Sequence, residues 1–448
     1  MQRSLPRVLF TLAMLAVAAC APRSEPFKTT TRPIDASFAS AIPAGTTAYS
    51  NDSLADVFTI LTHDMEWGAS RPNLVRFEGP VRVAMVGKGS NRYQVFLAEY
   101  LRRLRNEARI DVNVSAPKDA NLLVRFVPGQ EFSGRTNAQC IVVNGHPSWS
   151  ALQEDAAAHG ADAFERNKTL EKASAIIPNT IEPYKIRECI LEEVSQALGT
   201  ANDLYALGSS IFNDDDGHTW PTRLDYLMLR VLYDPRLETG LDRRETTARA
   251  REVLDDLNPD GERTDAPRLP LIRQQTFLNW RNRLHRLIGN RDLADSERLK
   301  SAEKLLSDAR KIAPYSGYHC EAAILESYIV LGMESDRMLK QIANATDICT
   351  RVHGTDDIRV AQLRLLKVRA LVKEDRYLEA LHNSDGLAEI FLAYGKEEDL
   401  LTTYAQRMVA HAKLDNIPER DKMLGKLQAW GAFSLGADNS IIEELRGY

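Results

Sequence analysis

The sequence has little of what marks nucleic-acid-binding, membrane-spanning or nucleophile-based hydrolytic proteins. Its formal net charge is −5 over 448 residues, so no excess of positive charge would attract a nucleic acid. Beyond the N-terminus, no apolar run approaches the roughly 20 residues that a membrane-spanning helix needs. No serine–histidine–aspartate or cysteine–histidine arrangement has supporting context. We therefore expect no nucleic-acid partner, and any hydrolytic chemistry would need a different kind of site.

The first 20 residues have the order of a secretory signal. Two arginines precede an uncharged apolar run that is too short to span a bilayer comfortably. The run ends in the letters VAAC, and this ending resembles the lipobox of bacterial lipoproteins. The resemblance implies that Cys20 is lipidated and becomes the mature N-terminus, which attaches the chain to a membrane. Ala21, where an Asp would signal inner-membrane retention, favours the outer membrane. An ordinary cleaved signal with a chance cysteine is the alternative.

Cysteine is scarce, and only four cysteines remain once Cys20 is set aside. An exported chain meets an oxidising compartment, where disulfides are permitted, and four cysteines allow three connectivities. The ranges 318–332 and 336–351 look like two helices joined by a short turn. In such an antiparallel hairpin, Cys320 and Cys349 would meet at the open end. We therefore predict a Cys320–Cys349 disulfide and, by remainder, a second disulfide between Cys140 and Cys189.

Composition and periodicity divide the rest of the chain into four segments. Residues 21–50 are rich in Pro, Ser, Thr and Ala and are typical of a flexible tether. Residues 51–254 mix strands and helices and predict an α+β domain. Residues 255–268 are turn-rich and charged, which indicates a linker. In the α+β domain we predict strands at 81–86, 110–115, 122–127, 140–143 and 175–177, and helices at 93–105, 182–198 and 222–233.

Residues 269–448 predict an all-α domain. Helix starts near 318, 358 and 398 recur about every 40 residues, a period typical of helical-hairpin solenoids. Ala370, Tyr377, Ala380 and Leu381 resemble part of a tetratricopeptide repeat; a non-repetitive bundle is the alternative. Such solenoids present concave surfaces to proteins or peptides, so we expect a protein or peptide partner in the cell envelope. The predicted helices are 271–289, 293–312, 318–332, 336–352, 356–373, 376–394, 397–413 and 418–433.

The segment 187–203, RECILEEVSQALGTAND, contains the candidate site. On a helical wheel its apolar residues form one arc, and Glu193 falls inside that arc. Glu192 and Gln196 lie beside the arc, four residues apart and therefore on one face. Gly199 permits a sharp exit from the helix. A carboxylate in an apolar stripe is costly unless it is paired or bound to a cation, so Glu193 needs an explanation.

The spacing resembles the zinc helix of metzincin metallopeptidases, H-E-x-x-H-x-x-G-x-x-H/D. The resemblance implies that Glu193 is the catalytic residue, and that Glu192, Gln196 and Asn202 stand where the three metal ligands would be. Asp203 could substitute for Asn202. The predicted order of strand, helix, strands and active-site helix also agrees, and the resemblance extends over about residues 75–235. We therefore predict a metzincin-like α+β domain followed by a tetratricopeptide-like helical solenoid.

Both histidines of that motif are absent, and amides are poor zinc ligands. A carboxylate pair with amides suits calcium better. Three interpretations of Glu193 follow. It is a structural carboxylate bonded to backbone or to a residue such as Arg187, without any cofactor; or it belongs to a divergent metal site with Glu192, Asp203 or His218; or it is the general base of a metal-dependent hydrolase.

The first of these interpretations is favoured because the ligands are lost. The combination of the lipobox, "EEVSQALGTAND" and "SIFNDDD" also resembles an uncharacterised family of bacterial lipoproteins. The leading prediction for function is accordingly a membrane-anchored binding or scaffolding protein of the envelope. A divergent metal-dependent peptidase or hydrolase is the alternative.

Overall fold

The structure is a computed structural model that covers the whole chain. The predicted signal peptide, with Cys20, lies outside the residues that it describes. So does most of the predicted helix 271–289. The described residues are 25–30, 33, 49–65, 70–132, 138–146, 150–151, 154, 158, 169–204, 207, 210–213, 218–263, 279–280, 282–284, 286–287, 294–312, 317–330 and 335–445.

The first half of the chain is built on a five-stranded sheet with the order β2-β1-β3-β5-β4. Four strands are parallel, and the edge strand β4 runs antiparallel to its neighbour β5. All residues of β5 are buried, as expected for a strand covered on both faces. The α+β prediction is confirmed. The strands are β1 (Val81–Val86), β2 (Val112–Val114), β3 (Leu122–Val127), β4 (Ile141–Asn144) and β5 (Ala173–Pro178).

Helices pack around this sheet and share one apolar core with it, which extends from Leu54 to Leu254. We call this unit the sheet lobe. The first and last helices of this unit, α2 (Asn51–His63) and α9 (Arg243–Leu257), were not predicted. They pack against each other. They are joined by polar contacts such as His63 Nε2 to Thr246 Oγ1 at 3.0 Å. The helices are α2 (Asn51–His63), α3 (Gln94–Glu107), α4 (Gly129–Phe132), α7 (Pro183–Ala197), α8 (Arg223–Leu232) and α9 (Arg243–Leu257).

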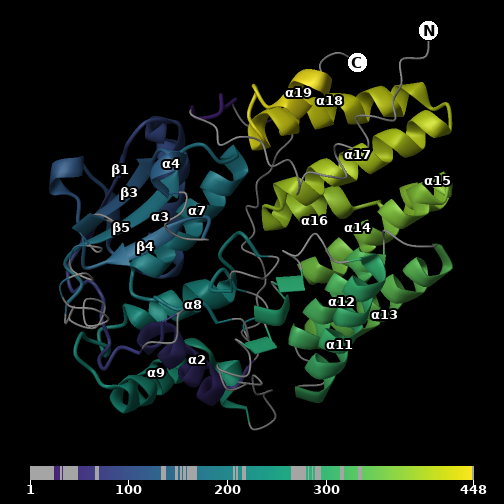
Figure 1. Ribbon diagram of the computed structural model, residues 1–448. Helices are drawn as coiled ribbons and strands as arrows, with labels where there is room; N and C mark the ends of the chain where they lie inside the picture. Colours follow the sequence, from purple (N-terminus) through teal and green to yellow (C-terminus); the bar gives the residue numbers. More distant parts are fainter. Residues whose placement is uncertain are drawn as a thin grey trace.

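The second half is helical, as predicted, and we call it the helical lobe. Successive helices pack on one another from α11 to α19, except that α15 and α16 each pack on α14 and α17 (Figure 1). The prediction of a single helix at 376–394 is wrong, because this range forms two helices that are divided at Gly386, which has a φ of 77°. The helices are α11 (Asp295–Ile312), α12 (Gly317–Val330), α13 (Ser335–His353), α14 (Ile358–Lys373), α15 (Tyr377–Asn383), α16 (Leu387–Tyr394), α17 (Glu397–Lys413), α18 (Ile417–Ser434) and α19 (Ser440–Leu445).

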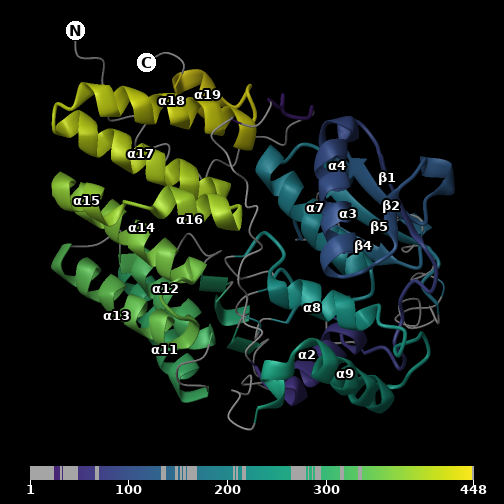
Figure 2. The same cartoon turned by 180° about the vertical axis from the view of Figure 1, so that it is seen from behind.

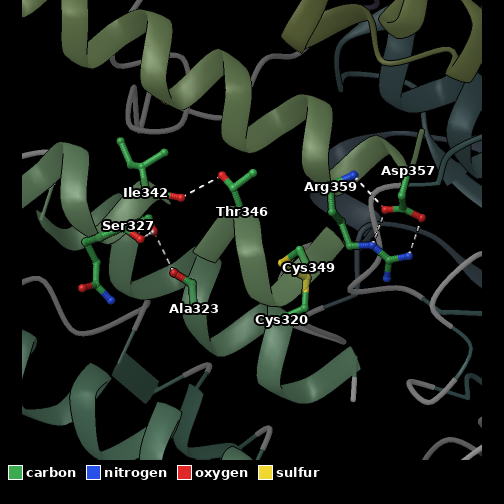
Figure 3. The surroundings of a disulfide bond; sticks show 9 residues. Cys320, Ala323, Ser327, Ile342, Thr346, Cys349, Asp357 and Arg359 are labelled. Atoms are coloured by element: carbon green, nitrogen blue, oxygen red, sulfur yellow. Dashed lines mark hydrogen bonds and ion pairs between the residues drawn. A yellow bond between two sulfur atoms is a disulfide. The ribbon is translucent and has the colours of Figure 1, made fainter. Parts of the chain in front are cut away.

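Both predicted disulfides are present. Cys320 of α12 and Cys349 of α13 meet at one end of the antiparallel pair, with their Cα atoms 4.8 Å apart (Figure 3). Cys140, at the start of β4, is bonded to Cys189 of α7, with Cα atoms 6.0 Å apart. The first disulfide therefore closes a helical hairpin, and the second fixes α7 to the edge of the sheet.

The two lobes lie side by side, with α7 on the side of the sheet lobe that faces α16 to α18 (Figures 1 and 2). A described part of the predicted tether also contacts both lobes. Glu25 is ion-paired with Lys88 of the sheet lobe. Lys28 donates its backbone N–H to Asp438 at 2.7 Å, beyond α18 of the helical lobe. Among the helices that the structure describes, none is long and apolar enough to cross a membrane.

Candidate functional site

Helix α7 carries the predicted site and is buried along nearly its whole length. Pro183 at its first turn has no N–H to leave unsatisfied and starts the helix. The helix ends at Ala197, and the chain turns away at Gly199, whose φ of 130° and close approach to the Val75 carbonyl leave no room for a side chain. The predicted apolar arc is buried, and Glu193 within it is only 3 % exposed. The surroundings of Glu193 are therefore enclosed rather than open to solvent.

The polar residues predicted as metal ligands are brought close together only in part. Gln196 donates its amide to the Asp203 carboxylate at 2.9 Å. Asn202 is fully buried, and its amide nitrogen lies 3.4 Å from the carbonyl oxygen of Ile60 in α2. The two amides are thus used in hydrogen bonds with the surrounding protein. This arrangement does not fit the three-ligand zinc set implied by the metzincin resemblance, because zinc is held by His, Cys or carboxylate side chains and two of the three positions here are amides.

A different group of potential ligands gathers beside Glu193. Among the His, Cys, Asp and Glu side chains that the structure describes, Cys140, Glu192 and Glu193 have ligand atoms within 4.8 Å of one another. Asp203 and His218 are not part of this group. The sulfur of Cys140 is already bonded to Cys189, and only a free thiolate would serve as a metal ligand. The group is therefore a possible cation site only after reduction of this disulfide.

His218 and Arg187, which were suggested as neighbours of Glu193, instead contact residues of the helical lobe. His218 is buried with its ring centre 5.3 Å from that of Tyr394, at the boundary with the helical lobe. Arg187, suggested as a partner of Glu193, binds the carboxylate of Glu397 in α17 with two of its guanidinium nitrogens, and Nε lies 3.0 Å from Oε1. Both residues therefore belong to the contact between the lobes.

That contact, which we call the seam, is the polar feature that sequence reasoning missed. Its central ion pair is almost completely buried, with Arg187 8 % and Glu397 5 % exposed. Arg187 also lies over the ring of Phe433 in α18, 4.0 Å from its centre. Tyr184 donates its hydroxyl to Glu398 at 3.2 Å and packs in the apolar core of the helical lobe. The sequence signal that could have indicated the seam is the set of charged residues on α7 that lie outside its apolar arc.

Glu188, at the seam, has a raised pKa. Burial raises the pKa of Glu188, and the nearby carboxylates of Glu397 and Glu398 add to the effect. Lys396 and Lys185 oppose it, and the resulting pKa is about 7. The raised pKa therefore reflects mainly the enclosure of Glu188 where the two lobes meet.

The sheet lobe is similar to one known protein family. Residues 51–252 match the family described as "Protein of unknown function (DUF2927)". The match coincides with the sheet lobe, from the start of α2 to the middle of α9. No curated protein and no solved structure matches the chain. The comparisons therefore assign no activity, and functional inference depends on the residues themselves.

Arg187→Met should lower the free energy of unfolding by about 3–5 kcal/mol, because it leaves the Glu397 carboxylate buried without its partner. The further change Glu397→Gln should recover most of that loss. The measurement is urea denaturation of the wild type, both single variants and the double variant as a mutant cycle.

The matched control is Arg351→Met, which removes an exposed ion pair with Asp347 on α13. It should cost less than about 1 kcal/mol. Equal losses for the two arginine variants, or additive losses in the Arg187 and Glu397 cycle, would show that the seam pair is not coupled as described.

Proposed function

We propose that this protein is a membrane-anchored envelope lipoprotein that binds a protein or peptide partner through its helical lobe. The observation that carries the proposal is a turn that recurs in that lobe after about 40 residues. In the first copy Asp375 has a φ of 58° and in the second Asp415 has a φ of 54°. The backbone N–H of the next residue bonds to the carbonyl five positions earlier at 2.9 Å in both.

Identical turns at a constant spacing support a stack of helical hairpins, which is the arrangement of tetratricopeptide-like solenoids. The turns also present apolar side chains to solvent. Leu378, directly after the first turn, is 71 % exposed, and Ile417, after the second, is 44 % exposed. An exposed apolar side chain close to each turn favours this edge for contact with another protein. We therefore place the partner on the edge formed by these two turns.

The sheet lobe is proposed to act as a rigid support and not as a catalyst. Its strand order and its antiparallel edge strand after β3 support a relationship to the metzincin upper domain. On α7, however, Gln196 is bonded to Asp203 and the Cys140 sulfur to Cys189. Gln196, which stands where a metzincin has a metal ligand, thus contributes a hydrogen bond, and Cys189 fixes the helix to the sheet. The same helix joins the two lobes, which favours a structural role.

The position of the N-terminal segment bears on membrane attachment. Glu25 is ion-paired with Lys88, only five residues after the predicted lipidation site at Cys20. Five extended residues span at most about 18 Å. With its lipid attached, Cys20 would therefore hold the parts of the two lobes around Lys88 and Asp438 close to the bilayer. Residues 21–24 would be the length of chain between lipid and folded body.

Cys20→Ala should move the protein from the membrane fraction to the soluble periplasmic fraction, because it removes the residue that accepts the lipid. The measurement is metabolic labelling with an alkyne-bearing palmitate, followed by fractionation. Ala21→Asp is the matched control and should keep the label while moving the protein to the inner membrane. A wild-type protein that takes up no label would contradict the proposed anchor.

A photo-crosslinking residue at Leu378 or at Ile417 should give a discrete adduct with an envelope protein in living cells. The control is the same residue at Val95 of α3, which is 83 % exposed but lies on the sheet lobe. Adducts are read from gel shifts and identified by mass spectrometry. Equal adducts at all three positions, or none at the two helical positions, would remove the proposed binding edge.

The second candidate function is that of a metal-dependent hydrolase with Glu193 as general base. Its support is the group of Cys140, Glu192 and Glu193, whose ligand atoms lie within 4.8 Å of one another. The Cys140 thiolate and the Glu192 carboxylate are acceptable zinc donors, and Glu193 would stay beside the metal as the base. This function requires a reduced Cys140 and would therefore be confined to reducing conditions.

If this second function holds, the reduced full-length chain should bind one equivalent of zinc and the oxidised chain should bind none. Glu192→Gln should weaken zinc binding by at least about tenfold, since a carboxylate ligand is lost. Glu398→Gln, at the seam, is the control and should leave zinc binding unchanged. Binding is measured by elemental analysis after dialysis, and cleavage of envelope peptides by Glu193→Gln against wild type. Zinc-free reduced protein would exclude the second function.

A further inference from the structure

Three helices of the helical lobe, α11, α12 and α13, enclose a pocket of about 410 Å³. It lies beside the disulfide between Cys320 and Cys349, because His319 and Ile348, which line it, are the chain neighbours of those cysteines. Its volume falls within the range of pockets that hold small ligands, which is roughly 300–1,000 Å³. The pocket is separate from α7 and from the exposed edge at Leu378 and Ile417.

Glu326 of α12 is the buried carboxylate of this pocket. The residue is only 4 % exposed, and its side chain lines the pocket. Its Oε2 atom is buried and accepts no hydrogen bond from any residue that the structure describes. Burial raises the pKa of this carboxyl group, and the charge of Glu303 adds to the effect, while Arg337 opposes it. A buried carboxylate oxygen that accepts no hydrogen bond is costly, so its retention requires a reason.

The other charges around the pocket are compensated or lie at its surface. Glu303 is ion-paired with Arg337. Asp347 is ion-paired with Arg351 at 3.0 Å. Arg310 is exposed. Burial lowers the pKa of His319, with a smaller contribution from Arg310, so the imidazole is neutral near pH 7. The interior of the pocket therefore presents a negative group and no buried positive one among the described residues.

We propose that this pocket binds an alkylammonium group, such as a lysine side chain of the partner, with the ammonium at Glu326. The proposal rests on the proposed binding function and names the chemistry that the helical lobe recognises. Leu306 and Ile348 offer apolar surface for the methylene stem, and Asn344 offers a polar group for a further ammonium proton. A metal ion is less suited, since no three His, Cys, Asp or Glu ligand atoms of the described residues converge here.

The experiment measures binding to the full-length chain in detergent by isothermal titration calorimetry. The probes are the peptide acetyl-Ala-Ala-Lys-Ala-Ala-amide, its norleucine counterpart, which has the stem without the charge, and 1,5-diaminopentane. The lysine peptide should bind at least about tenfold more tightly than the norleucine peptide, which corresponds to about 1.4 kcal/mol. If only the diamine binds, the ligand is a free amine and the alkylammonium assignment is supported without a peptide.

Glu326→Gln should abolish the preference for the charged probes, since the amide keeps the shape but not the charge. Glu303→Gln is the matched control, because Glu303 also lines the pocket but is exposed and already paired with Arg337. It should change the affinity less than about threefold. Equal binding of the lysine and norleucine peptides, or an unchanged preference in Glu326→Gln, would overturn the proposal.

The variant is not expected to fail by unfolding. Glu326→Gln removes an uncompensated buried carboxylate, so its melting temperature should equal or exceed that of the wild type. The outcome is also separable from that of the proposed function. Crosslinks at Leu378 that persist in Glu326→Gln would leave the binding function intact and refute a role of the pocket in it. Amine binding without any crosslink would support the pocket and refute the binding edge.

Discussion

The buried ion pair between Arg187 and Glu397 determines how the two lobes meet. Removing two charges from water costs several kcal/mol each, and only good geometry with further hydrogen bonds offsets that cost. Here the guanidinium meets both carboxylate oxygens and also lies over the ring of Phe433. A small displacement of one lobe would separate the charges while they stay buried. The pair therefore fixes one relative position of the lobes more than it adds to their net stability.

This constraint also governs what α7 can do. The helix is bonded to β4 through Cys189, contacts the helical lobe through Arg187, and has Tyr184 in the core of that lobe. A helix held on several sides has little freedom to adjust around a substrate. Its polar side chains find partners within the protein, as Gln196 does with Asp203. The position of α7 between the lobes and the hydrogen bond between Gln196 and Asp203 thus both favour the proposed structural role of this helix.

Local patterns predicted local structure well. Strands β1 and β3 occupy their predicted ranges because each is an apolar run bounded by turn residues. The disulfide between Cys320 and Cys349 followed from one helical hairpin. The seam could not be predicted in this way, since Arg187 and Glu397 are 210 residues apart in sequence and a charge on a helix usually faces solvent. The break between α15 and α16 was missed because apolar spacing continues across residues 384–386, which form a turn that ends at Gly386 with a positive φ.

The recurring turn in the helical lobe has a physical cost that supports its interpretation as a repeat. A non-glycine residue in the left-handed region is disfavoured by roughly 1 kcal/mol, and Asp tolerates it better than most. Asp375 and Asp415 both adopt this conformation at equivalent positions after α14 and α17. A single strained turn can be an accident of packing. Two such turns 40 residues apart, each with the same backbone hydrogen bond, agree with the proposed stacking of helical hairpins.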